Sequence, residues 1–276
     1  MFKKINRFLF RAIYFVLVRF TFTRNFTELL LYNYWQRRTT ISHNGFKVDF
    51  ICPNEFTRFR ANTFSTKEPE TLDWIDLMPK GSILWDIGAN VGIYSCYAAI
   101  ARDCSVFAFE PSVFNLELLA RNIFINNLTD KVCIVPIPLN DSISINTLNM
   151  TSTDWGGSLS TFGKEYGHDG LKLEKAFEYQ LVGVSIDDMV DKLFLPFPDY
   201  IKLDVDGIEE LILAGGRKVL SKIKGILIEI NDDFEKQQKN AELILREAGL
   251  QFKEKRNSVT SEESEFKNTY NQIWIR

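Results

Sequence analysis

The sequence predicts an α/β protein built on a doubly wound, mostly parallel β-sheet. Short apolar strands and helices alternate five times between residues 82 and 250, and such alternation places helices on both faces of a parallel sheet. The strands are apolar along their whole length, which is typical of strands covered on both faces. Two late strands, near 251–255 and 272–275, have no helix between them, so we expect an antiparallel hairpin at one edge of the sheet.

The segment before this sheet carries its own signals. Residues 39–51 predict a hairpin with Asn44-Gly45 as its two-residue turn. A helix is expected over about 69–78, because Pro69 suits the first turn of a helix. We therefore expect three parts, which are a basic and apolar helical extension (1–38), a hairpin with a lead-in helix (39–81) and the main domain (82–276).

Within the main domain, hydrophobic periodicity and Gly or Pro breaks assign the elements in order. The strands are expected at 82–87, 105–109, 132–137, 200–204 and 225–230. The helices are expected at 93–102, from Pro111 to about 127, at 186–193, after Asp206 and at 232–248. Residues 141–185 give only strand-like pieces and a Gly-rich patch, Trp155-Gly156-Gly157-Ser158, so no regular fold is assigned to them.

Composition excludes several classes of protein. The 276 residues are 45% hydrophobic, which is enough for one sizeable core. The net charge of −3 argues against binding nucleic acid through bulk charge, so no nucleic-acid partner is expected. Four scattered cysteines and two histidines argue against a structural zinc site. The same cysteine spacing fits a reduced, cytoplasmic chain better than a disulfide framework.

The first 27 residues differ from the rest in charge. They carry six Lys and Arg and no acid, and this charge of +6 leaves −9 for residues 28–276. On a helix, Lys3, Lys4, Arg7 and Arg11 would share one sector, while the remaining circumference is Phe, Leu, Ile and Val. No apolar run is long enough for a transmembrane helix. Two interpretations stay open: the helix contacts an anionic membrane at its inner face, or it packs on the protein's own core.

Ligands of doubly wound sheets bind beyond the carboxyl ends of the strands. The first strand ends in a glycine-containing loop, and Glu110 ends the second strand about twenty residues later, where an acid can accept both ribose hydroxyls. A dinucleotide loop would need glycine where this chain has Asn90 and Ile93. Asp86, just before the loop, would repel a pyrophosphate and would attract a cation such as the sulfonium of S-adenosylmethionine. An NAD-dependent enzyme is therefore disfavoured.

Three motifs together carry a family resemblance: Asp86-Ile87-Gly88-Ala89-Asn90-Val91-Gly92-Ile93-Tyr94-Ser95, then Phe109-Glu110-Pro111 with Asn115, then Ile201-Lys202-Leu203-Asp204-Val205-Asp206-Gly207-Ile208-Glu209. Over about 82–250 the chain resembles the FkbM-type methyltransferases. One departure is Asp206, where the family more often has Glu. The resemblance implies a class I methyltransferase (Rossmann-like) fold, S-adenosylmethionine as donor and O-methylation of a hydroxyl on a sugar, glycolipid or natural product.

The resemblance also implies roles for individual residues. The methionine part of the donor would be held by Asp86, Gly88, Asn90 and Gly92. Glu110 would bind the ribose, and Asp141, after the third strand, would lie near the adenine.

For the acceptor hydroxyl, the sequence offers Asp204 as general base, because it ends the fourth strand where an acceptor approaches. Asp204 could instead only pair with Lys202, since a lone buried ammonium is costly. His168, in the irregular segment, is a second candidate base. Asp206 and Glu209 have the spacing of a capping box, which favours a helix-start role for Glu209 over catalysis.

Two alternative functions remain open. A Mg²⁺-assisted O-methyltransferase would use oxygen ligands from Asp204, Glu229 and Asn231 at neighbouring strand ends. A non-catalytic module would bind S-adenosylmethionine without transferring its methyl group. We expect no metal cofactor, and we expect the acceptor to be a hydroxyl of a small molecule or glycan.

Overall fold

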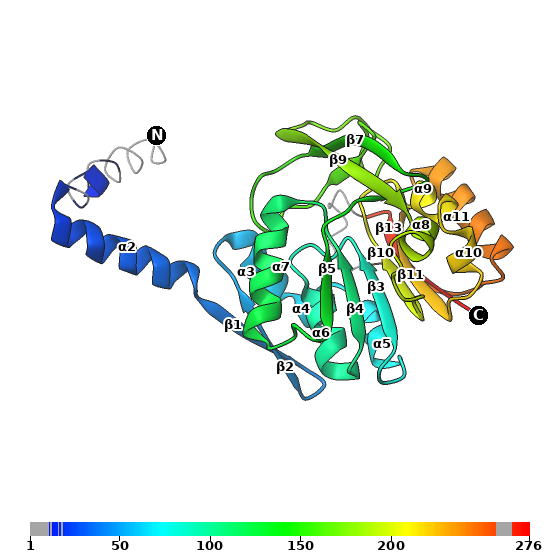
Figure 1. Ribbon diagram of the computed structural model, residues 1–276, viewed down its shortest axis with the longest axis horizontal. Helices are drawn as coiled ribbons and strands as arrows, with labels where there is room; N and C mark the ends of the chain where they lie inside the picture. Colours follow the sequence, from blue (N-terminus) through cyan, green and yellow to red (C-terminus); the bar gives the residue numbers. More distant parts are fainter. Residues whose placement is uncertain (1–10, 12, 16, 18, 258–266) are drawn as a thin grey trace.

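The computed structural model describes residues 11, 13–15, 17, 19–257 and 267–276. Its centre is a seven-stranded sheet in the order β12-β13-β11-β10-β3-β4-β5 (Figure 1). Every neighbouring pair is parallel except the two that involve β13. The predicted doubly wound sheet with an antiparallel edge hairpin is confirmed. The strands are β3 (Ile83–Ile87), β4 (Ser105–Phe109), β5 (Val132–Val135), β10 (Tyr200–Leu203), β11 (Gly225–Asn231), β12 (Gln251–Asn257) and β13 (Thr269–Ile275).

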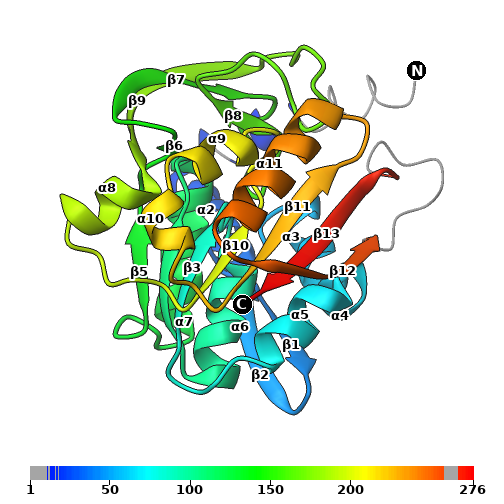
Figure 2. The same cartoon turned by 90° about the vertical axis from the view of Figure 1, so that its right-hand side faces the viewer.

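Helices cover both faces of this sheet (Figure 2). One face carries α3 (Glu55–Asn62), α4 (Phe64–Lys67), α5 (Pro69–Asp76), α6 (Ile93–Arg102) and α7 (Val113–Ile125). The other carries α8 (Ile186–Asp191), α9 (Glu209–Ala214), α10 (Arg217–Leu220) and α11 (Glu235–Glu247). Alternate residues of each strand enter the two cores, so Leu84 packs on the first face and Trp85 on the second. Helices α3 and α4 were not predicted from the sequence, although α3 begins with a capping box at Asn54 and Thr57.

The predicted hairpin is present as β1 (Arg38–His43) and β2 (Phe46–Ile51). Its turn residues Asn44 and Gly45 both have positive φ, 46° and 84°, as a two-residue hairpin turn requires. The amide of Ile51 donates to Asn122 Oδ1 of α7 at 2.9 Å, and apolar residues of β2 share a core with the sheet. The hairpin is thus packed against the main domain.

Residues 139–185, mostly unassigned from the sequence, form a second sheet. Its strands are β6 (Leu139–Asn140), β7 (Ser144–Met150), β8 (Ser160–Phe162) and β9 (Phe177–Ser185), in the order β6-β9-β7-β8. In Figure 1, β7 and β9 cross the top of the view, above the ends of β3, β4 and β5. Leu148 and Phe162 turn inward and join the main core, while Ile145 and Val182 form an exposed cross-strand pair. The second sheet therefore covers the edge where ligands are expected.

Helix α2 (Thr21–Trp35) projects away from the rest of the molecule (Figure 1). None of its residues is buried. The two interpretations concern the helix of the first 27 residues, which lies partly outside the described residues, so both stay predictions. Lys3, Lys4 and Arg7 of the predicted basic sector lie outside the described residues, and Arg11 is exposed. Within the described part of the chain, every helix is too short or too polar to cross a membrane.

Candidate active site

The loop after β3 runs directly across the end of β10. Gly88 has φ +85°, and a Cβ there would lie 1.8 Å from the carbonyl oxygen of Asp204. Gly92, at φ +81°, precedes α6, and a Cβ there would lie 2.4 Å from Leu119 Cδ1. Both glycines are therefore required by the loop's own packing, because only glycine tolerates these dihedrals and this closeness. Between them Asn90 also has positive φ, at 52°.

Glu110 is brought onto this loop, as the sequence predicted. Its carboxylate accepts the amide N–H of Asn90 and that of Ser112, each at 2.8 Å. Burial raises the pKa of Glu110 to about 7, although the two amides act to lower it. A carboxylate oxygen has lone pairs for more than one hydrogen bond, so Glu110 retains capacity for ligand hydroxyls.

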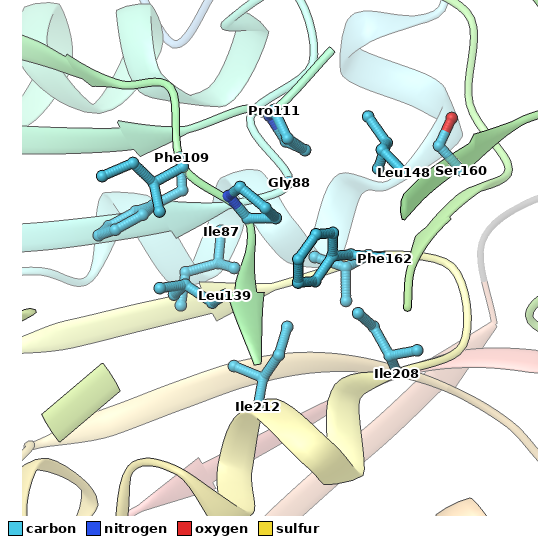
Figure 3. Close-up of a pocket in the computed structure, with 13 residues that line it drawn as sticks. Ile87, Gly88, Phe109, Pro111, Leu139, Leu148, Ser160, Phe162, Ile208 and Ile212 are labelled. Carbon is cyan, nitrogen blue, oxygen red and sulfur yellow. The ribbon is translucent and has the colours of Figure 1, made fainter. Parts of the chain in front are cut away.

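A narrow apolar cavity of about 40 Å³ lies beside Gly88 at the carboxyl ends of β3 and β4. Figure 3 shows Ile87, Phe109 and Leu139 on one side of it and Phe162 and Leu148 on the other. Ligand pockets more often measure about 300–1,000 Å³, so the cavity is too small for a nucleoside unless its lining moves. The remaining lining residues are Gly88, Pro111, Ile137, Pro138, Ser160, Val205, Ile208 and Ile212.

Asp141, predicted to lie near the adenine, is exposed just beyond β6. Its carboxylate accepts a hydrogen bond from Ser142 Oγ at 2.9 Å, and it is not among the lining residues of the cavity. Its role toward the donor stays a prediction.

Asp86 is almost fully buried, with 1% of its surface exposed, on the face that carries α6. Its Oδ2 accepts a 2.5 Å hydrogen bond from Ser95 of α6, and its Oδ1 lies 4.0 Å from Lys202 Nζ. Burial raises the pKa of Asp86, with Lys202 acting in the opposite direction. Asp86 is thus linked through Lys202 to β10.

Lys202 is the buried centre of an ionic cluster. Its Nζ lies 2.8 Å from Asp204 Oδ2 and 5.3 Å from the centroid of the Tyr94 ring. Burial alone would lower the pKa of Lys202, but the nearby carboxylates of Asp204 and Asp86 raise it. The expected pairing of Lys202 is confirmed. Asp204 is 26% exposed, and it accepts the hydrogen bond of Lys202 through Oδ2.

The junction of α4 and α5 contributes further charged residues to this cluster, which were not predicted from the sequence. Glu68 is buried and pairs with Lys67 Nζ at 2.7 Å, while the Tyr94 hydroxyl donates to its Oε2 at 3.0 Å. Burial would raise the pKa of Glu68, but Lys67 and Lys202 lower it to about 2. No local sequence pattern identifies these residues. Pro69 predicts the start of a helix, but it does not predict which residues the preceding side chains contact.

Three carboxylates meet where β10 and β11 end. One oxygen from each of Asp204, Asp206 and Glu229 lies within 4.8 Å of the others. Burial and the charge of Asp204 raise the pKa of both Asp206 and Glu229. Asn231, the third ligand of the metal alternative, instead accepts the amide of Asp233 at 2.9 Å through Oδ1. The structure thus brings together two of the three proposed ligands, with Asp206 as their neighbour.

His168 reaches the same edge. It is buried, and its charge acts to lower the pKa of the Asp206 carboxyl. The backbones touch as well, because a Cβ on Gly207 would lie 2.5 Å from the carbonyl oxygen of Gly167. The second candidate base is therefore a neighbour of Asp206.

The predicted capping box is wrong. Helix α9 begins at Glu209 with Ile208 as its N-cap, so Glu209 is not at the third helical position. Its carboxylate instead accepts the amides of Val205 and Gly207, and the side chain of Gln237 donates to it. Asp206, at φ 61°, turns away and accepts the amide of Leu159 at 2.7 Å. The helix-start role expected of Glu209 remains, with different partners.

The Gly-rich patch closes over the loop after β3. The carbonyl oxygen of Gly157 accepts from Asn90 Nδ2 at 2.8 Å and from Asn115 Nδ2 at 3.1 Å. The amide of Gly156 donates to Asn115 Oδ1 at 2.9 Å. Trp155 packs edge-on against Trp35 of α2, with ring centroids 5.3 Å apart. This segment connects the loop after β3 to the projecting helix α2.

Comparison with known proteins adds a family to this geometry. The model of the methyltransferase FkbM domain matches residues 86–253, more than half of the chain. The chain belongs to the FkbM methyltransferase family. The resemblance carried by the three motifs is confirmed, and the sheet is that of a class I methyltransferase.

The hexuronic acid methyltransferase AglP of Haloferax volcanii is 26% identical to this chain over 150 residues. The match covers 54% of this chain and 56% of AglP, so the chain spans about half the length of that relative. Methyltransferase FkbM from Methylobacillus flagellatus is 16% identical with a TM-score of 0.48, over 92% of this chain and 59% of that one. Precorrin-6y C5,15-methyltransferase from Geobacter metallireducens is 17% identical with a TM-score of 0.44, over 76% and 86%.

Proposed function

We propose that this FkbM family member transfers a methyl group from S-adenosylmethionine to a hydroxyl of a sugar or glycolipid. Two carboxylates at one edge of the sheet carry the proposal. Glu110, after β4, accepts an amide of the loop after β3, and Asp204, after β10, pairs with Lys202. We call the loop after β3 the donor loop, this loop with Glu110 the donor half of the site, and Asp204 with Lys202 the acceptor half. The sugar is favoured because the relative AglP is named for a hexuronic acid. A natural-product hydroxyl has the same chemistry.

The residues of the donor half fit S-adenosylmethionine, which supplies a methyl group activated on a sulfonium. Glu110 would accept hydrogen bonds from the ribose hydroxyls, since its oxygens retain lone pairs. The apolar walls beside Gly88 suit an adenine ring, and Asp86 adds negative charge near a cationic ligand. Because the cavity is small, the segment from Trp155 to Phe162 would have to shift outward to admit the donor.

The acceptor half would activate the hydroxyl. Lys202 holds Asp204 Oδ2, which would leave Oδ1 to accept the proton of the acceptor hydroxyl. The hydroxyl oxygen would form its bond to the methyl carbon as the bond from that carbon to the sulfonium sulfur breaks, with S-adenosylhomocysteine as the leaving group. Alignment of the two reactants on one strand edge can supply up to about 7–11 kcal/mol of the barrier. His168 is a less direct candidate base, because it neighbours Asp206.

Two measurements on the same preparation test this function. Calorimetric titration with S-adenosylmethionine and with NADH should show binding of the first and not of the second. Methyl release on a panel of neutral sugars, uronic acids and lipid-linked glycans should then detect turnover. Donor binding without turnover on the whole panel would favour a non-catalytic module, and binding of NADH alone would overturn the proposal.

A further inference from the structure

Helix α2 displays large apolar side chains to solvent along its whole length. Phe22 is 82% exposed, and the other apolar residues from Phe20 to Trp35 are each about half exposed or more. They are Phe20, Phe26, Leu29, Leu30, Leu31, Tyr32, Tyr34 and Trp35. Soluble surfaces scatter such side chains singly, and a contiguous set indicates a contact with a partner.

These side chains are not spread evenly around the helix. At 100° per residue, Phe22, Phe26, Leu29 and Leu30 fall within one sector of about 100°. Arg24 and Glu28 fall on the opposite side of the helix, beside Leu31. The tyrosines and Trp35 lie between the two or at the end of the helix. Aromatic residues with a polar atom are favoured where an apolar medium meets water.

Charge identifies the partner. The first 27 residues carry +6 with no acid, whereas residues 28–276 carry −9. The described arginines near α2, Arg11, Arg19 and Arg24, are all exposed. Helix α2 itself carries one Arg and one Glu, and the basic charge lies in the residues that precede it. A basic segment that leads into an exposed apolar helix fits the surface of a membrane with anionic lipids, which attracts this segment and repels the acidic body.

We propose that α2 lies in the surface of an anionic lipid bilayer, with Phe22, Phe26, Leu29 and Leu30 facing the acyl chains. Because Trp35 contacts Trp155, membrane binding by α2 would place the segment that covers the donor loop near the lipid. Tyr34 adds a second link, since Arg58 of α3 donates to its hydroxyl at 3.5 Å. If the proposed function also holds, the acceptor that meets this site is a sugar on a lipid carrier; the membrane contact itself does not depend on that function.

The test is co-sedimentation of the full chain with phosphatidylglycerol–phosphatidylcholine vesicles, against phosphatidylcholine alone. The variant Phe26→Glu/Leu30→Glu should lower the partition coefficient about tenfold or more, because two buried apolar side chains are lost. Phe124→Glu/Phe194→Glu is the matched control, since these phenylalanines are 71% and 83% exposed on the body of the molecule. Its binding should equal that of the wild type, and added salt should weaken binding of both.

Three results would overturn the membrane proposal. They are no binding to anionic vesicles, equal binding of the α2 variant and the wild type, and a wild-type dimer that the α2 variant turns into a monomer by light scattering. The last result would make α2 a surface for a second copy of the chain. Calorimetric binding of S-adenosylmethionine by the α2 variant keeps this outcome separate from a failure of the proposed function.

Discussion

The two halves of the site hold their carboxylates by different means. In the donor half, Glu110 accepts two backbone amides and Asp86 accepts a serine hydroxyl. In the acceptor half, Asp204 pairs with a lysine, and Asp206 and Glu229 crowd beside it. Amides and hydroxyls fix a position, whereas neighbouring charges shift one another's pKa. This difference fits the roles that we propose, which are donor binding for the first half and proton transfer for the second.

Removing the cation of the acceptor half should have the largest effect. Lys202→Met leaves buried Asp86 and the neighbouring Asp204 without their counter-ion, and breaking a buried pair costs about 3–5 kcal/mol. Urea denaturation should show this loss in the free energy of unfolding. Lys224→Met is the matched control, because its pair with Asp199 is largely exposed and is worth about 0–1 kcal/mol. Equal losses in the two variants would show that Lys202 is no special centre.

The second test separates the halves by function. Asp204→Asn keeps the shape of the side chain but removes the base, so kcat should fall by about 10²–10⁴. The affinity for S-adenosylmethionine should stay within about twofold, since Asp204 does not belong to the donor half. Turnover on a responsive acceptor and calorimetric titration measure the two quantities. Undiminished turnover would remove Asp204 as base and leave His168→Asn as the next variant to assay.

The same contrast explains what the sequence could predict. Donor residues follow one another at strand ends, so Asp86, Gly88 and Glu110 could be located from local pattern alone. Lys202 and Asp204 could also be located, because Lys202 lies on β10 and Asp204 directly follows that strand.

The rest of the site depends on contacts between distant segments. Glu68 reaches Lys202 and Tyr94 only through helices whose positions the sequence does not reveal. In the second sheet, Ser144–Met150 pairs with Phe177–Ser185 across a long connection. These strands could not be assigned from the sequence, because they are defined by hydrogen bonds between distant segments. The capping box failed for a related reason: Asp206 and Glu209 have the spacing of a capping box, but Asp206 instead accepts the amide of Leu159, the residue before β8.

The third test uses pH on the donor half. The pKa of Glu110 is about 7 in the folded protein against 4.5 for an ordinary glutamate, so the folded state binds its proton more tightly. Its contribution to stability is present below pH 4.5 and is lost as pH rises through 7, by at most about 3 kcal/mol. Glu110→Gln should flatten this part of the profile in urea denaturation between pH 5 and 7.5. Glu209, also raised to about 7, leaves a residual slope.

Asp141→Asn serves as the control for that profile. Its carboxylate is exposed, so the pH dependence of unfolding should match the wild type. Donor affinity adds a second readout: it should rise through pH 7 in the wild type as Glu110 ionises, and not in Glu110→Gln. If Glu110→Gln left the pH profile of donor affinity unchanged, the assignment of Glu110 to the ribose would be contradicted.

The smallest effect is expected from metal removal. Mg²⁺ bound by Asp204, Asp206 and Glu229 would have to compete with Lys202, whose ammonium already lies 2.8 Å from Asp204. Burial and the charge of Asp204 raise the pKa of Glu229, which disfavours the ionised carboxylate that Mg²⁺ binds, and Mg²⁺ loses its own water reluctantly. Turnover should therefore be the same in EDTA as in millimolar MgCl₂. A loss in EDTA that Mg²⁺ restores, together with a weaker Mg²⁺ requirement in Glu229→Gln, would assign the acceptor half to metal-assisted deprotonation and reduce Lys202 to a structural counter-ion.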